Sequence, residues 1–132
     1  MENPRMKNLI LVAVAMIGTL SSCDKNTPEY TMEGKWVYPN NSLNTMYIYE
    51  NGIRYTYYCV GPDCDSLYNT FQAGDTNALP SQLNYTFVND TLRVDLNFGN
   101  ELVTLVTFEC DGGKLFMDSE FSHLWRLSSD CE

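Results

Sequence analysis

Residues 83–96 read LNYTFVNDTLRVDL, and apolar and polar side chains alternate along this stretch on both sides of Asn89-Asp90. Alternation with a period of two is typical of a strand with one buried face, and Asn and Asp tolerate the positive φ of a two-residue turn. Such a turn places one set of side chains on a single face: Leu83, Tyr85, Phe87, Leu92, Val94 and Leu96. The stretch therefore predicts an antiparallel hairpin with one apolar and one polar face.

A second hairpin is predicted around Asn51-Gly52, because Asn-Gly fits a two-residue type I′ turn best. This turn pairs Ile48 with Tyr55 and Met46 with Tyr57, and we expect these side chains to face the interior. The opposite face, which we expect to lie on the surface, carries Tyr47, Tyr49, Arg54 and Thr56.

A third hairpin is predicted around Gly112-Gly113, with Val106, Phe108, Leu115 and Met117 on its buried face. Strands at 35–38 and 122–127 complete a set of eight in up-and-down order. Closure of eight strands into a barrel removes exposed sheet edges and encloses either packed side chains or one small ligand. We therefore predict an all-β, eight-stranded antiparallel up-and-down barrel; the alternative is an open β-sandwich.

The predicted interior combines apolar walls with phenol hydroxyl groups, which is the composition of a small-ligand pocket. The residues assigned to this ligand-binding wall are Trp36, Tyr38, Ile48, Tyr55, Tyr57, Tyr85, Phe87, Val94, Phe98 and Phe108. The alternative is that these large side chains fill a short barrel to native density and leave no cavity.

Residues 60–81 form a connection that is longer than most loops in compact domains. Within it, Leu67, Tyr68 and Phe71 are spaced to form one turn of helix. We predict that these three side chains form a lid over the open mouth of the barrel. The alternative is that they fill the barrel permanently.

Four of the five cysteines, Cys59, Cys64, Cys110 and Cys131, lie in or beside the predicted strands. In up-and-down order, Cys59 and Cys64 fall at one rim of the barrel, and Cys110 and Cys131 fall at the other. Bonded cysteines have Cα atoms within about 7 Å, whereas the two rims are about 20 Å apart. We therefore predict disulfides 59–64 and 110–131. No histidine or further cysteine pair stands at ligand spacing, so we predict no metal site.

Residues 1–22 have the pattern of a secretory signal: basic residues precede the uncharged run 9–20, LILVAVAMIGTL, which is too short to span a bilayer. The tetrapeptide Leu20-Ser21-Ser22-Cys23 resembles the lipobox of bacterial lipoproteins. The resemblance implies that Cys23 becomes the first residue of the mature chain and carries acyl chains such as palmitate, which anchor the protein to a membrane. We predict a tether at 23–33 and the folded domain at 34–132.

The 132 residues include 17 acidic and 8 basic side chains, for a formal net charge of −9. A nucleic-acid partner is not expected, because such binding depends on neutralising phosphates with Lys and Arg. His123 is the single histidine, and its neighbour Ser122 points to the other face of the strand, so no triad is formed. Carboxylates are scattered singly and no phosphate-binding glycine loop is present. We predict no enzymatic activity and no cofactor.

Gly34-Lys35-Trp36 in the first strand and Trp125-Arg126 in the last resemble the lipocalin pattern, in which an early tryptophan packs near a late arginine at the closed end of the barrel. Together with Asn51-Gly52, Asn89-Asp90-Thr91-Leu92 and Asp111-Gly112-Gly113-Lys114-Leu115, these motifs are similar to small lipocalin-like lipoproteins of the Bacteroidetes over residues 34–127. The resemblance implies a lipid-anchored protein of the bacterial cell envelope, at the outer membrane or cell surface; the alternative is the inner membrane.

Two functions fit these features. In the first, the anchored barrel binds a small apolar or amphipathic ligand between its aromatic side chains. In the second, the protein is a non-enzymatic module, such as a subunit or inhibitor, that binds a protein of the envelope.

Overall fold

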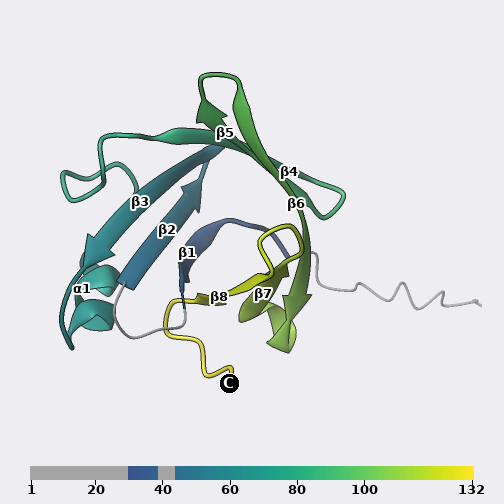
Figure 1. The fold of residues 1–132 in the computed structure, drawn as a ribbon. Helices are drawn as coiled ribbons and strands as arrows, with labels where there is room; N and C mark the ends of the chain where they lie inside the picture. Colours follow the sequence, from purple (N-terminus) through teal and green to yellow (C-terminus); the bar gives the residue numbers. More distant parts are fainter. Residues whose placement is uncertain (1–29, 39–43) are drawn as a thin grey trace, which may run out of the picture.

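A computed structural model describes residues 30–38 and 44–132. Its eight strands form a closed, antiparallel barrel in which each strand pairs with its neighbours in sequence and the last pairs with the first (Figure 1). The strands are β1 (Gly34–Val37), β2 (Asn44–Glu50), β3 (Ile53–Cys59), β4 (Leu83–Val88), β5 (Thr91–Asn97), β6 (Asn100–Glu109), β7 (Lys114–Met117) and β8 (Ser122–Arg126). The predicted up-and-down barrel is confirmed, and the open sandwich is wrong.

The predicted signal segment and the lipidation site Cys23 lie outside the described residues. The predicted tether at 23–33 extends too far, because residues 30–33 already pack on the barrel. Met32 is 1% exposed and belongs to the core. The indole N–H of Trp36 donates a hydrogen bond to the main-chain oxygen of Met32 at 2.8 Å, which fixes this segment on the first strand.

Two of the predicted turns have the expected geometry. Asn51 and Gly52 have φ of 50° and 78°, and Asn89 and Asp90 have φ of 50° and 57°. Positive φ at both central positions is the requirement of a type I′ turn, and it sets the predicted pairing of the flanking strands. Ile48 lies opposite Tyr55 in the first hairpin.

The third turn is longer than predicted. Glu109 pairs with Lys114, so the turn comprises Cys110 to Gly113 and contains a short 3-10 helix, η1 (Cys110–Gly112). Cys110 and Asp111 both have positive φ, which ends β6 earlier than the glycines alone predict. The observed register differs from the predicted one by two residues, an even number, so every side chain keeps its predicted face.

The interior face of β2 and β3 is the opposite of the one predicted. Directly opposed residues of neighbouring antiparallel strands share a face. Trp36 lies opposite Tyr47, and Arg54 lies opposite both Tyr49 and Leu83, so these side chains point inward. The prediction that Ile48, Tyr55 and Tyr57 face the interior is therefore wrong, as is the surface position of Tyr47 and Tyr49.

The centre of the barrel is filled by apolar side chains from all around the sheet. The buried members of this core are Met32, Trp36, Tyr49, Leu83, Leu92, Val94, Val106, Leu115, Met117 and Leu124. Partly buried side chains pack against them: Tyr38, Tyr47, Tyr85, Phe87, Leu102 and Phe108. The core therefore occupies much of the volume in which the sequence predicted a ligand.

Helix α1 (Cys64–Thr70) packs on the outside of the barrel against β2 and β3 (Figure 1). Tyr68 and Phe71 are 1% and 7% exposed and cover the outer face of these strands, whereas Leu67 points away. Lys35 Nζ donates hydrogen bonds to the main-chain oxygens of Tyr68 and Asn69, at 2.9 and 3.1 Å, so a cation stands at the carboxyl end of the helix. The predicted lid and the permanent interior plug are both wrong: the connection forms a second layer.

Phe98, which we predicted to face the interior, is fully exposed. It lies in the β5–β6 turn, and the register of the two strands shifts between Asp95 and Asn97. Asn97, Phe98 and Gly99 all have positive φ, so β5 ends before its alternation can carry Phe98 into the core.

Both predicted disulfides are present, Cys59–Cys64 with Cα atoms 5.6 Å apart and Cys110–Cys131 with Cα atoms 6.1 Å apart. The first joins β3 to α1, and the second joins η1 to the residues that follow β8. Within the described ranges, no helix has the length and hydropathy needed to cross a lipid bilayer.

The barrel has two narrow seams. β3 pairs with β4 only through Ile53–Asn84 and Arg54–Leu83, and β1 pairs with β8 only through Trp36–Arg126 and Val37–Trp125. The remaining neighbours pair over longer stretches. The sheet therefore consists of two curved parts, β1–β3 and β4–β8, that meet at these seams.

Candidate functional site

One pocket lies at the end of the barrel where β1 begins, which we call the N-terminal end. Because successive strands alternate in direction, this end also carries the turns at 51–52, 89–90 and 110–113 and the last residues, 127–132. The opposite end carries the start of the 60–82 connection and the β5–β6 and β7–β8 turns. The connection then returns along β3, where Leu79 N–H donates to the main-chain oxygen of Thr56, and β4 begins beside Ile53 and Arg54.

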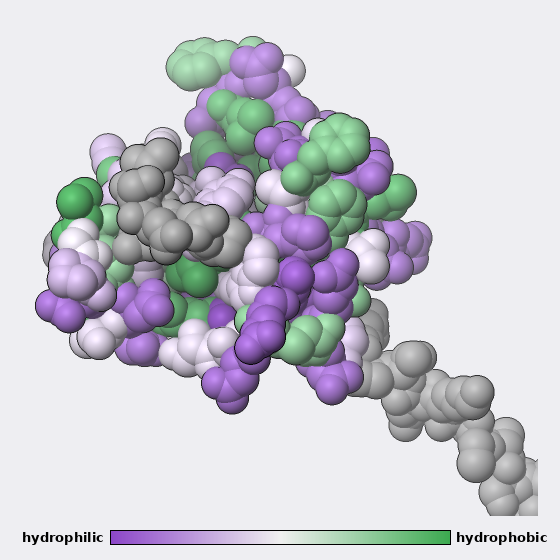
Figure 2. Space-filling model, turned by 60° about the horizontal axis from the view of Figure 1, so that its bottom comes forward, coloured by the Kyte–Doolittle hydropathy of each residue, from purple (hydrophilic) through white to green (hydrophobic). Residues whose placement is uncertain are grey.

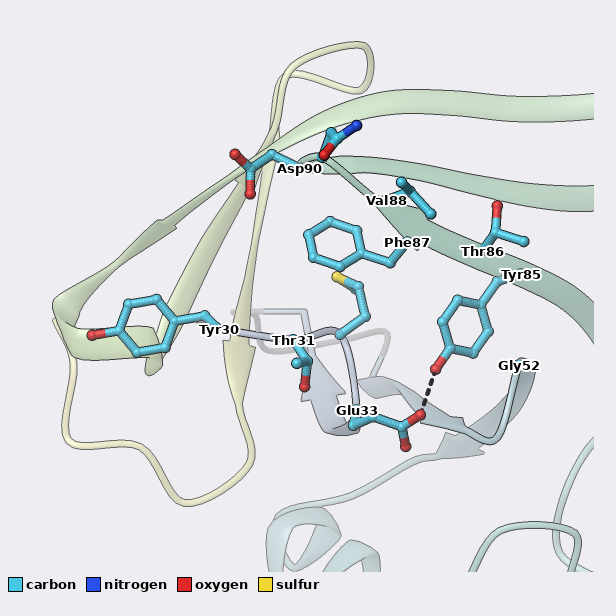
Figure 3. Close-up of a pocket in the computed structure, with 11 residues that line it drawn as sticks. Tyr30, Thr31, Glu33, Gly52, Tyr85, Thr86, Phe87, Val88 and Asp90 are labelled. Atoms are coloured by element: carbon cyan, nitrogen blue, oxygen red, sulfur yellow. Dashed lines mark hydrogen bonds between the residues drawn. The ribbon is translucent and has the colours of Figure 1, made fainter. Parts of the chain in front are cut away.

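The pocket has a volume of about 660 Å³ and is partly open to solvent. It lies between the segment 30–33, Gly52 and residues 85–90 of β4 and its turn (Figure 3). This volume is in the range of pockets that hold small molecules. The site therefore forms where the N-terminal segment crosses in front of β4.

A hydrogen-bonded pair joins the two sides of the pocket. The hydroxyl of Tyr85 donates to Glu33 Oε1 at 3.0 Å (Figure 3). The main-chain N–H of Asn51 donates to the same oxygen at 3.2 Å. Burial raises the pKa of Tyr85 well above its ordinary value, and the neighbouring Glu33 carboxylate raises it further. Tyr85 therefore acts as a neutral donor that fixes the position of Glu33.

Aromatic side chains form the inner wall of the pocket. The Phe108 ring centre lies 5.9 Å from that of Phe87 and 5.5 Å from that of Tyr30. The ring of Tyr85 packs edge-on against the buried Tyr49 at 4.9 Å. These contacts hold the wall rigid, because each ring is supported from the core side by a second ring.

The pocket contains only two of the predicted ligand-binding residues, Tyr85 and Phe87. Four others face the interior but do not line the pocket, namely Trp36, Tyr38, Val94 and Phe108. The remaining four lie elsewhere, on the outer face under α1 or in the β5–β6 turn: Ile48, Tyr55, Tyr57 and Phe98.

Sequence reasoning missed the contribution of Tyr30, Met32 and Glu33, which it assigned to the tether. A signal for this segment exists, since Tyr30 and Met32 continue backward the alternation that leads to Trp36. The segment carries three large or charged side chains to the pocket before the first strand begins.

A second polar group lies inside the barrel at Arg54. Its guanidinium carbon is 4.5 Å from the centre of the Tyr47 ring, and it also interacts with the Tyr49 hydroxyl. Burial raises the pKa of both tyrosines to about 12, although the charge of Arg54 opposes this rise. Among the described residues Arg54 has no carboxylate partner. Its guanidinium instead contacts the Tyr47 ring and the Tyr49 hydroxyl.

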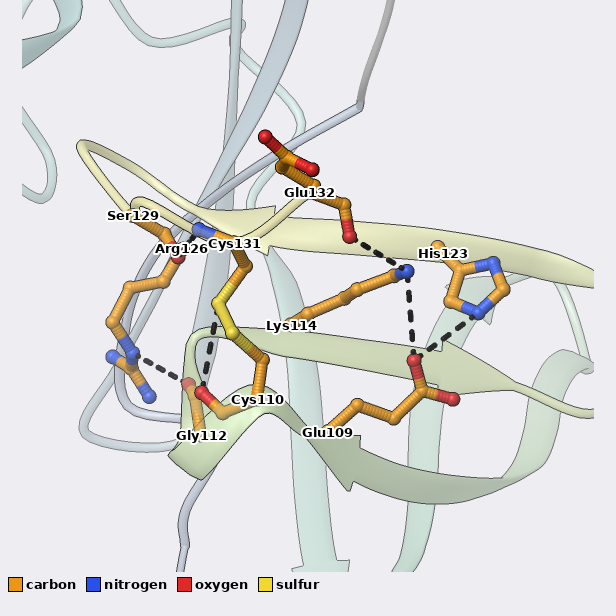
Figure 4. The surroundings of a disulfide bond; sticks show 9 residues. All are labelled: Glu109, Cys110, Gly112, Lys114, His123, Arg126, Ser129, Cys131 and Glu132. Atoms are coloured by element: carbon orange, nitrogen blue, oxygen red, sulfur yellow. Dashed lines mark hydrogen bonds and ion pairs between the residues drawn. A yellow bond between two sulfur atoms is a disulfide. The ribbon is translucent and has the colours of Figure 1, made fainter.

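A smaller and more open pocket, of about 370 Å³, lies beside the Cys110–Cys131 disulfide (Figure 4). Next to it, Glu109 is 3.6 Å from Lys114 and 3.5 Å from His123. A side chain on Gly113 would clash with the sulfur of Cys131. The disulfide ties the last residues to η1, and the Glu109 carboxylate links β6 to β7 and β8. These structural contacts explain why the residues of this region lie together.

The outer surface mixes polar and apolar side chains. On the face shown in Figure 2, hydrophobic residues stand in small groups among hydrophilic ones. Arg93 and Glu101 form an exposed ion pair at 3.2 Å across β5 and β6. In the part of the chain that the structure describes, no group of three or more His, Cys, Asp or Glu side chains is placed to hold a metal ion.

Comparison of the chain with protein-family models, with curated proteins and with solved structures finds no match in any of the three.

Proposed function

We propose that the protein is a lipid-anchored envelope protein that binds a small amphipathic molecule at the N-terminal end of its barrel. The observation that carries this proposal is the pocket of about 660 Å³ between the segment 30–33 and β4. Because the barrel centre is filled by core side chains, the ligand occupies this end instead of the middle of the barrel.

The lining of the pocket suits an amphipathic ligand. One wall consists of the aromatic rings of Tyr85 and Phe87, which bury apolar surface. The other presents polar groups, among them Glu33 and the turn residues Asn89 and Asp90. A molecule with an apolar body and a polar end satisfies both walls at once.

The anchor follows from the lipobox-like sequence at Cys23. Two disulfides in one small domain suit an exported protein, since such bonds persist in oxidising compartments. Six residues separate Cys23 from Tyr30, and the seven Cα–Cα steps between them span at most about 25 Å when fully extended. The anchor would therefore hold the pocket close to the membrane surface.

Native mass spectrometry of the full-length protein, extracted from membranes in mild detergent, tests the binding proposal. We expect the spectrum to show a retained small molecule. We also expect the purified protein to bind the neutral fluorophore N-phenyl-1-naphthylamine, and the retained molecule to displace it. Phe87→Ala is expected to weaken fluorophore binding about tenfold or more, while Phe98→Ala, on an exposed turn, leaves it unchanged. Phe87→Leu keeps most of the apolar volume and serves as a folded variant if Phe87→Ala is unstable.

Absence of both a retained molecule and fluorophore binding in the wild-type protein would reject the proposal. The anchor is tested separately by the mass of the N-terminal peptide. We expect acylation at Cys23 and none in Cys23→Ala, and an unmodified Cys23 in the membrane-extracted protein would overturn this part.

A second candidate function, binding of an envelope protein, is favoured by three apolar side chains at the opposite end. Val60, Phe98 and Phe121 are each at least 85% exposed and lie in or beside connections at that end. Co-purification from membranes is the test. A stoichiometric protein that is lost when all three are changed to Ser supports this function, and no loss contradicts it.

A further inference from the structure

We infer that the ligand of this pocket carries a positive charge, as an organic ammonium ion with an apolar body. This inference rests on the proposed function and adds the charge of the ligand. It is carried by the signs of the charges around the pocket: Glu33 and Asp90 line it, and among the described residues no Lys or Arg does.

The Glu33 carboxylate is held in position but not neutralised. Its Oε1 accepts hydrogen bonds from Tyr85 and Asn51. Arg126 donates to the main-chain oxygen of Glu33, at 3.0 Å, and not to its carboxylate, and the Arg126 guanidinium stacks on Trp36. Within the described residues the second carboxylate oxygen of Glu33 has no recorded partner, so it can accept a hydrogen bond from a ligand.

Asp90 faces the pocket from the β4–β5 turn. Figure 3 shows Asp90 and Glu33 on opposite sides of the pocket, with the ring of Phe87 between them. The main-chain oxygen of Asp90 accepts a hydrogen bond from Val106 at 2.8 Å, which fixes the turn, while its side chain is exposed. Both carboxylates therefore belong to the lining of the pocket and add to the negative potential that a cation there would meet.

The aromatic wall favours the same charge. A ring face attracts an ammonium group, and Tyr85 and Phe87 present rings beside the two carboxylates. An anionic ligand would meet two carboxylates and a chain of net charge −9, and the described part of the lining offers it no basic residue. A fatty-acid carboxylate is therefore a poor ligand for this pocket, although its alkyl chain would fit the aromatic wall.

Three probes of nearly equal shape test the inference with the purified full-length protein: 2-phenylethylammonium, 2-phenylethanol and 3-phenylpropionate. Isothermal titration calorimetry at pH 7 and low salt is expected to give affinities in the order ammonium, alcohol, carboxylate. We expect the ammonium to bind about tenfold more tightly than the alcohol, from two carboxylates and a ring face.

Glu33→Gln and Asp90→Asn are the matched variants, because Gln can still accept the two hydrogen bonds and Asn tolerates positive φ. Each is expected to weaken ammonium binding about threefold and to leave the alcohol unchanged, since each removes one charge. Asp95→Asn on β5, outside the pocket, is the control and should change neither affinity.

Equal affinities for the ammonium and the alcohol, or no effect of both carboxylate variants, would overturn the inference. If the alcohol and the neutral fluorophore still bind in a Phe87-dependent way, the proposed function stands and only the ligand charge is wrong. If neither neutral probe nor the ammonium binds, the proposed function fails as well.

Discussion

The guanidinium carbon of Arg126 lies 4.3 Å from the centre of the Trp36 ring and joins the last strand of the barrel to the first. Arg126 Nε donates to the oxygen of Gly112 at 3.2 Å, and its Nη1 donates to the oxygen of Glu33 at 3.0 Å. Burial lowers the pKa of Arg126. One side chain therefore connects the N-terminal segment, the β6–β7 turn and the narrow β8–β1 seam.

Removal of this side chain should destabilise the barrel. We expect Arg126→Met to lower the free energy of unfolding by about 2–3 kcal/mol, because two charge-assisted hydrogen bonds and a cation–π contact are lost. Arg93→Met is the matched control, since the exposed Arg93–Glu101 pair contributes less than about 1 kcal/mol. Urea unfolding measures both, and equal losses would contradict the role given to Arg126.

The two disulfides should differ in their contribution to stability. Cys110–Cys131 closes a sequence separation of 21 and Cys59–Cys64 one of 5. If the unfolded chain is constrained as loop-closure entropy predicts, their removal costs about 3 and about 2 kcal/mol, respectively. Guanidinium unfolding of two variants, each with both cysteines of one disulfide changed to Ala, tests this order. A larger loss of unfolding free energy without Cys59–Cys64 than without Cys110–Cys131 would refute it.

Helix α1 should matter for stability and not for binding. Tyr68→Ala or Phe71→Ala is expected to cost about 3 kcal/mol, because each removes a buried ring from the outer layer. Leu67→Ala, 44% exposed, should cost less than about 1 kcal/mol. Fluorophore affinity should be unchanged in all variants that remain folded, and a large change on replacing Leu67 would restore the lid hypothesis.

Stability should fall at alkaline pH. Burial raises the pKa of Tyr57 to about 12 from its ordinary value of 10.0, and that of Tyr49 likewise to about 12. Above pH 10 the unfolded chain loses these protons first, so the stabilisation present below pH 10 is lost as the pH rises toward 12. Urea unfolding at increasing pH, with tyrosinate absorbance at 295 nm, measures this. Titration of all tyrosines near pH 10 in the folded protein would refute it.

The local pairing of the chain could be predicted from sequence, because Asn51-Gly52 and Asn89-Asp90 dictate which residues lie opposite one another. The disulfides followed from the same strand order. The face of β2 and β3 could not be predicted, since Tyr47 and Tyr57 are equally aromatic and both faces of these strands are buried, one by the core and one by α1. Alternation identifies an interior only where the other face meets water.

The pocket was harder to predict than the barrel. Tyr85 and Phe87 were found by their alternation, but Glu33 precedes the first strand and meets Tyr85 only when the sheet has closed. Phe98 follows the alternation of β5 in sequence, yet the positive φ of Asn97 ends that strand first. Spacing along the chain predicts neither the Glu33–Tyr85 contact nor the exposure of Phe98.

The arrangement of the disulfides relative to the seams has a mechanical consequence. Cys59–Cys64 lies wholly in the β1–β3 part and Cys110–Cys131 wholly in the β4–β8 part, so no covalent cross-link bridges either seam. Each part has its own disulfide, and the 60–82 connection links the two parts along the chain. Among the described residues, the two parts are therefore held together across the seams by strand pairing and the shared core, so reduction of either disulfide would leave both seams unchanged.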